Sequence, residues 1–304
     1  MNKTHKIFLV FIIFVSSFFR IIPFFNDLGS DFYSTLESYP KEIANGYGFY
    51  YVLGDLFGKI NLPFIIFWFF SSFFLSISFY IYISNTNFSG IKKYGIDYFI
   101  VVFFVLGFII PWFSFQNYRF GAALLLLTST LGKTIKKSVI KITIAVSIHS
   151  LCVIFIPFLF IKKQSKIVFV FLSSVILFLV YVNLEFITQI TLKYIGYENY
   201  LSDFEQFSDN KVMNWLVYVR LSCLIYCGYL LIKKEYYSGL FSFIAIYVLS
   251  VLFTPFYGRL TPFIYLYIII GMKREFSWGK VVFLFLLLID SYFSITKSIF
   301  HYGV

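Results

Sequence analysis

Long apolar runs separated by short basic clusters dominate the chain. A run such as Ile65–Ile83 contains no charged residue and matches the roughly 20 helical residues that cross about 30 Å of hydrocarbon. Continuous runs favour helices over a transmembrane β-barrel, whose strands would be alternating segments of about 10 residues. The pattern predicts an all-α, polytopic integral membrane helix bundle with about nine or ten membrane segments.

The charges between the runs order these segments across the membrane, because cytoplasmic loops carry an excess of Lys and Arg. Starting inside, the predicted helices cover about 7–25, 62–84, 96–112, 117–131, 167–184, 214–232 and 240–254, a short stretch after 262, and 280–296. Two longer segments, at about 26–61 and 185–213, are expected outside. The first contains an interfacial helix within 43–57. We expect a single membrane-embedded domain over residues 1–304.

The apolar run at 139–161 does not fit this order, because lysine clusters lie at both of its ends. A single crossing would place one cluster outside, against the charge rule. We expect instead two half-helices that meet near His149 and form a re-entrant segment. Irregular backbone of this kind is tolerated in a membrane only where protein or a water-filled cavity surrounds it.

Composition agrees with the membrane assignment and excludes other classes. The chain is 60% hydrophobic and 13% charged, too apolar for a soluble domain of 304 residues. Its net charge of +11 follows from lysines in short loops, so we expect no nucleic-acid partner. Cys152, Cys223 and Cys227 lie inside apolar runs, without a disulfide framework or a metal-ligand spacing. We expect neither a metal nor a cofactor.

Arginine is placed differently from lysine. Four of the five arginines fall in the outer part of a predicted helix or in an outer turn: Arg20, Arg119, Arg220 and Arg259. Ionisable groups inside a bilayer cost about 3 kcal/mol each and usually face a cavity, a partner or a substrate. Arginine also suits bidentate phosphate contacts. The four predict an outer-face site for a ligand such as a lipid-pyrophosphate-linked sugar.

These residues also have simpler interpretations. An arginine near a helix end often extends to lipid headgroups or pairs with a local acid. A lone membrane histidine such as His149 is often a packing or hydrogen-bonding residue. The aromatic cluster around Tyr47 fits an interfacial belt as well as a sugar-binding platform.

Three stretches carry a family resemblance. They are SDFYSTLESYP with GYGFYYVLGDLF (30–40 and 46–57), NYRFGAALLLL (117–127) and KKSVIKITIAVSIHSLCVIFIPF (136–158). In order and spacing they resemble the EpsG-like and Wzy-type bacterial polysaccharide polymerases. Arg119 and His149 match that pattern. Gly46 and Tyr47 replace an expected Glu-Pro, and Phe120 replaces a Gln.

The resemblance implies a membrane glycosyltransferase of the bacterial cytoplasmic (inner) membrane, active at its outer face. It would polymerise undecaprenyl-pyrophosphate-linked repeat units, as donor and acceptor, into O-antigen or capsular polysaccharide. Membrane lipids, a chain-length regulator and a flippase would be its partners. The candidate catalytic residues are Arg119, His149 and Arg259. The candidate substrate-binding residues are Arg20, Arg220, Asp31, Glu42 and Tyr47.

The arginines would neutralise the leaving pyrophosphate. His149, or an outside carboxylate such as Asp31 or Glu42, would be the general base. The alternative is a transporter or flippase for a lipid-linked or anionic substrate, in which the same arginines bind and release without chemistry.

Overall fold

The computed structural model describes residues 3–21, 49–85, 101–116, 118–130, 133, 135–156, 159, 262–263, 265–266 and 281–289. All regular structure in these residues is helical, and no strand occurs among them. The chain divides into two compact units, Met1–Ile156 with Met272–Val304, and Pro157–Gly271. The single domain expected over residues 1–304 stays a prediction.

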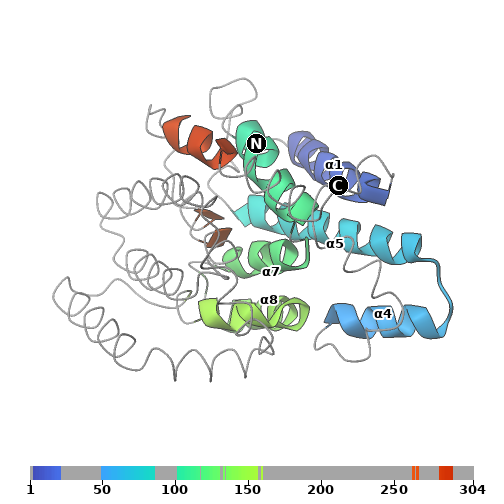
Figure 1. Ribbon diagram of the computed structural model, residues 1–304. Coiled ribbons are helices and arrows are strands. Elements are labelled where there is room, and N and C mark those ends of the chain that lie inside the picture. The colour runs from blue at the N-terminus through green and yellow to red at the C-terminus, as the bar shows by residue number, and fades with distance from the viewer. Residues whose placement is uncertain are drawn as a thin grey trace, which may run out of the picture. The chain divides into compact units, whose positions relative to one another are not determined.

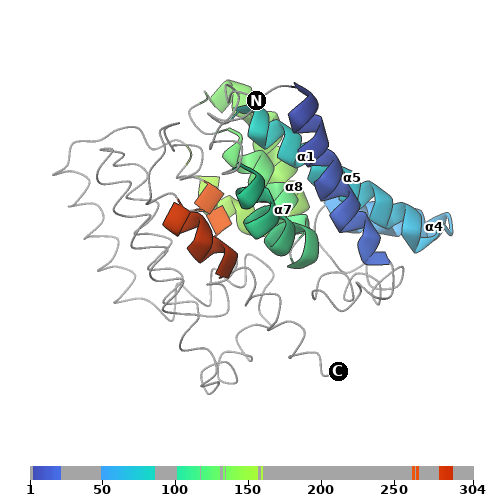
Figure 2. The same ribbon diagram turned by 90° about the horizontal axis from the view of Figure 1, so that it is seen from above.

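The helical elements whose bounds the described residues define lie in the first unit. They are α1 (Lys3–Phe18), η1 (Phe19–Ile21), α4 (Phe49–Lys59), α5 (Phe64–Asn85), η4 (Val105–Gln116), α7 (Tyr118–Thr128), α8 (Ile135–Ile148) and η5 (Ser150–Phe155). Residues 101–104 lead into η4, and residues 281–289 are also helical. In this unit α1 packs on α5, α5 on α7, and α7 on α8, while η4 contacts both α1 and α7 (Figures 1 and 2).

Several predicted helices are present close to their expected positions. The helices expected at about 7–25, 62–84, 96–112 and 117–131 correspond to α1 with η1, α5, residues 101–116, and α7. The helix expected within 43–57 corresponds to α4. In the described part, α5 is the one helix both long and apolar enough to cross a bilayer, and 101–114 and 118–128 form shorter apolar helices. The predicted spans 167–184, 214–232 and 240–254 lie outside the described residues.

Helix α5 is more polar on its packed face than on its exposed face. Its exposed side chains are Ile65, Phe69, Phe70, Phe73, Ile77 and Tyr80, whereas four serines of the packed face are at most 2% exposed: Ser71, Ser72, Ser76 and Ser78. Three of these hydroxyls donate to carbonyl oxygens one turn earlier. The fourth, that of Ser72, accepts from the Ser17 hydroxyl of α1 at 3.1 Å. A surface helix of a soluble domain has the opposite distribution.

The link from α4 to α5 is a tight helix C-terminus. The Leu62 amide donates to the Phe57 carbonyl at 2.9 Å and the Asn61 amide to the Gly58 carbonyl at 3.0 Å, the two bonds of a Schellman motif. Asn61 has a φ of 53°, a conformation that asparagine tolerates better than most residues. Pro63 then precedes α5, where its missing N–H costs no helical bond.

Element η4 has π-type turns and contains Pro111. Proline lacks a backbone N–H and clashes with the preceding turn of an α-helix, which is a local reason for the departure from α geometry. The start of α7 packs against η4 so closely that a β-carbon at Gly121 would overlap Cβ and Cγ of Phe113. Gly121 therefore sets the distance between these two elements.

We expect Gly121→Ala to lower the stability of the protein, because the buried Phe113 has to move away. Overpacking of this kind costs about 1–3 kcal/mol. Gly107→Ala is the matched control, since its new β-carbon would lie 3.0 Å from Cδ1 of Leu288, the movable end of a side chain. The midpoint of thermal unfolding in detergent should fall clearly more for Gly121→Ala, and equal midpoints would contradict the close packing.

Candidate functional site

Arg20, an arginine predicted to lie at the outer membrane face, is completely buried. Its Nη1 donates to the carbonyl oxygen of Ser114 at 3.1 Å. Its guanidinium carbon lies 5.7 Å from the centre of the Trp68 ring. Burial of an unpaired charge would be very costly, and these contacts offset part of that cost. Ser114 lies in the last turn of η4, so Arg20 places a positive charge where terminal carbonyls lack helical partners.

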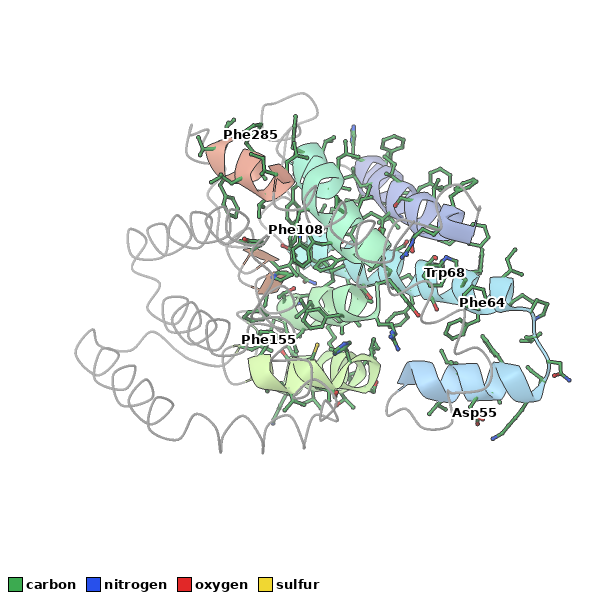
Figure 3. All side chains as sticks on the ribbon, in the orientation of Figure 1. Asp55, Phe64, Trp68, Phe108, Phe155 and Phe285 are labelled. Carbon is green, nitrogen blue, oxygen red and sulfur yellow. The ribbon has the colours of Figure 1, made fainter. Side chains whose placement is uncertain are left out.

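Trp68 joins α1, α5 and α7. Its indole Nε1 donates to the carbonyl oxygen of Ser17 at 2.9 Å, near the end of α1 where carbonyls again lack helical partners. Its ring meets the ring of Tyr118 edge to face, with centroids 4.7 Å apart. Trp68 and Phe64, whose rings are stacked, lie in the first turns of α5 (Figure 3). The beginning of α5 thus meets the end of α1 and the beginning of α7.

Arg119 follows Tyr118 in the first turn of α7, and is half-buried. Its guanidinium carbon lies 5.9 Å from the centre of the Tyr118 ring. The start of a helix carries a partial positive charge that favours anions over cations. Arg119 and the first amides of α7 therefore place two sources of positive potential at one point.

His149 lies beside the same turn of α7. Its ring centroid is 4.9 Å from that of Phe120, the residue after Arg119, and its side chain is half-buried. Phe155 of η5 also contacts Phe120, at 6.4 Å. We call Arg20, Trp68, Tyr118, Arg119, Phe120 and His149 the arginine-aromatic cluster. It brings together three candidate residues predicted from three separate segments.

The helix break expected near His149 is present. Helix α8 ends at Ile148, His149 has extended backbone with φ −150° and ψ 110°, and the 3₁₀ helix η5 begins at Ser150. The His149 amide still donates to the Ala145 carbonyl, and its own carbonyl accepts from the Cys152 amide, both at 3.0 Å. The break in the helix therefore leaves neither of these two polar groups unsatisfied. The return of the chain to the inner face stays a prediction.

Contacts at both ends of the helices set their relative directions. The end of α1 meets the end of η4 and the beginning of α5. At the other end of α5, Ser84 meets Lys6 of α1 and Asn85 meets Lys133, which follows α7. Helix α1 is thus antiparallel to α5, and α5 is parallel to α7. This is the order predicted from the charges, and it puts the arginine-aromatic cluster at the end predicted to face outward.

The other candidate residues, Arg220, Arg259, Asp31, Glu42 and Tyr47, lie outside the described residues. Within the described part, Asp55 of α4 pairs with Lys59 at 2.6 Å, and it points away from α5 (Figure 3). No group of three His, Cys, Asp or Glu side chains converges in that part of the chain. The described chemistry of the site is therefore cationic and aromatic, with one imidazole.

Sequence reasoning missed Trp68, Tyr118 and Ser114. An aromatic residue in an apolar run is usually a packing or interfacial residue, so the spacing of Trp68 gave no signal. Tyr118 had one usable signal, because it directly precedes Arg119. Ser114 contributes only its backbone carbonyl, which no side-chain pattern can reveal.

Comparisons with known proteins give no relative: no family model, no curated protein and no solved structure matches the chain.

We expect Trp68→Phe to destabilise the protein by about 1–3 kcal/mol, because the buried Ser17 carbonyl would lose its indole donor. Phe73→Leu is a suitable control, since Phe73 is exposed on the opposite face of α5 and donates no hydrogen bond. Thermal unfolding in detergent measures both. A Trp68→Phe midpoint no lower than that of Phe73→Leu would show that the hydrogen bond contributes nothing.

Proposed function

We propose that the chain is a membrane glycosyltransferase that polymerises undecaprenyl-pyrophosphate-linked repeat units into O-antigen or capsular polysaccharide. The observation that supports this most directly is that Arg119 and His149 both lie at the beginning of α7. Arg119 is in its first turn beside Tyr118, and His149 packs on Phe120, the next residue. A cationic group and an imidazole at one bundle end suit a reaction in which a pyrophosphate leaves and a proton is removed. The sequence resemblance points to the same two residues.

The proposed location is the bacterial cytoplasmic membrane, which the chain spans with nine or ten segments. Among the described residues, this location is supported by the distribution of side chains on α5, where Phe and Ile face outward and serines face inward. Lipid solvates the apolar face, whereas small and hydroxyl-bearing residues suit helix contacts in a membrane. The exposed Ile7, Phe8 and Phe11 of α1 extend the same argument to a second helix.

In the proposed reaction, an acceptor hydroxyl attacks the anomeric carbon of the donor. The bond from that carbon to the pyrophosphate oxygen breaks, and the pyrophosphate leaves with the electron pair. His149 takes the acceptor proton as general base. Arg119 and the α7 amides stabilise the negative charge that develops on the leaving oxygen. Arg20, buried between η4 and α5, holds the end of η4 and adds positive potential nearby.

We expect Arg119→Gln to abolish long glycan chains, because removal of one preorganised charge-stabilising group lowers such rates by about 100- to 1,000-fold. His149→Gln should lower the rate by a factor of about 100 to 10,000 through loss of the base. Polymer length in cells, compared at equal protein level, measures both. Arg274→Gln, at a predicted cytoplasmic position, is the control and should leave the chain length unchanged.

A purified system separates the polymerase from the transporter or flippase. Detergent micelles do not separate two compartments, so donor and acceptor reach the protein from all sides. A transporter would therefore produce no measurable change in the substrate. The wild-type protein should still form products longer than one repeat unit, and Arg119→Gln should not. Absence of any product from the wild type, with an intact lipid-linked substrate, would favour the transporter.

The predicted re-entrant segment has its own test. Single cysteines at Lys137 and Lys162, introduced after replacement of the three native cysteines by Ala, should both react with a membrane-impermeant thiol reagent only when the cytoplasmic face is open. A return of the chain at His149 places both positions on the same side. Labelling of one position from each side would show that 139–161 crosses the membrane once.

A further inference from the structure

Two lysines from distant segments each contact the C-terminal end of α5. Lys6, near the start of α1, donates from Nζ to the Ser84 hydroxyl at 3.4 Å. Lys133, which follows α7, donates from Nζ to the side-chain oxygen of Asn85 at 2.7 Å. Ser84 and Asn85 are adjacent, so both ammonium groups are held at the same end of one helix. This end is opposite the arginine-aromatic cluster.

A third lysine lies next to the second. Lys141 of α8 is half-buried and donates from Nζ to the Ser129 hydroxyl at 3.4 Å. Its charge interacts with that of Lys133. We call Lys6, Lys133 and Lys141 the lysine cluster. Its members come from three segments, so tertiary packing rather than a local run of lysines brings them together.

The lysine cluster lacks a compensating acid within the described residues. Each ammonium group is held by a neutral oxygen, and the ion pair in this part of the chain joins Asp55 to Lys59 on α4. The negative end of the α5 dipole offsets about half a charge. Like charges held together in this way repel one another, and an anion bound between them would remove that repulsion.

We propose that the lysine cluster binds the phosphate of an acidic phospholipid of the inner leaflet. The adjoining surface suits the rest of such a lipid, because Phe73, Ile77 and Tyr80 lie exposed along α5 toward its Ser84 end. Acyl chains can lie along this apolar strip while the phosphate reaches the ammonium groups. A free phosphate would use only the lysines. Basic sites between helices at the cytoplasmic face bind lipid phosphates in this way.

The proposal rests on the membrane placement and not on glycosyl transfer, so binding is measured without glycan. The full chain, purified in a neutral detergent, is titrated with phosphatidylglycerol, and bound lipid is counted by native mass spectrometry. Replacing Lys6, Lys133 and Lys141 together by Gln should weaken binding on the order of 100-fold, at about fivefold per lysine. The wild-type protein should bind phosphatidylcholine no more tightly than the triple Gln variant binds phosphatidylglycerol.

The matched control replaces three other lysines at the same predicted face, Lys3, Lys136 and Lys137, by Gln. They are exposed and removing them changes the net charge by the same amount. This control should retain near wild-type affinity, and an equal loss would show diffuse attraction instead of a site. Inorganic phosphate at the same concentration should not displace the lipid, and displacement would favour a soluble phosphate ligand.

Two further variants keep the test decisive. A variant in which Lys6, Lys133 and Lys141 are all replaced by Arg retains the three positive charges and should still bind the lipid. If the triple Gln variant does not fold, single Gln variants are titrated instead, and unchanged affinity in all three would overturn the proposal. Arg119→Gln should bind phosphatidylglycerol normally whether or not it polymerises glycan, so the two proposals fail independently.

Discussion

The described structure depends on the satisfaction of polar groups inside an apolar bundle. Helix α5 turns its serines inward, and their hydroxyls bond to carbonyls one turn away or to Ser17 of α1. At its beginning, the Trp68 indole caps a carbonyl at the end of α1. Where water cannot solvate a buried polar atom, leaving that atom without a hydrogen bond destabilises the fold more than leaving an apolar atom weakly packed. These bonds set which helix ends can meet, and so they position the cluster around Arg119.

Arg20 shows the same constraint applied to a full charge. Its guanidinium is completely buried, and the Ser114 carbonyl and the Trp68 ring both contact it. Arginine suits such a position because its charge is delocalised over a planar group that stacks on aromatic faces and is weakly hydrated. A lysine at residue 20 would present a compact, strongly hydrated ammonium group. The structure thus gives Arg20 a packing role that is observed, whereas its role in substrate binding stays a prediction.

The sequence predicted these elements unevenly, for physical reasons. The bounds of α5 and α7 could be predicted closely because apolar runs that end at polar or charged residues are local signals. The break at His149 could be predicted because lysine clusters at both ends of one run conflict with the charge rule. The π-type geometry of η4 and the contact between Gly121 and Phe113 could not, because both depend on how two helices pack. The cluster itself was half predictable: its charged members stand out in an apolar chain, whereas Trp68 and the Ser114 carbonyl do not.

Opposite ends of one bundle carry chemically different cations, and the difference agrees with the two functions proposed for these ends. Lys6 and Lys133 contact neutral oxygens at the end of α5, and Lys141 contacts the Ser129 hydroxyl just after α7, where compact charges and flexible stems suit a mobile lipid phosphate. Arg20 and Arg119 lie against Trp68 and Tyr118, where aromatic faces hold a rigid, planar cation in one orientation. Stabilising a leaving pyrophosphate requires such fixed charges, because a group that reorients during the reaction loses part of the energy it could supply. The pairing of arginine with aromatic rings at one end, and of lysine with hydroxyl and amide groups at the other, is therefore what separate catalytic and lipid-binding ends would require.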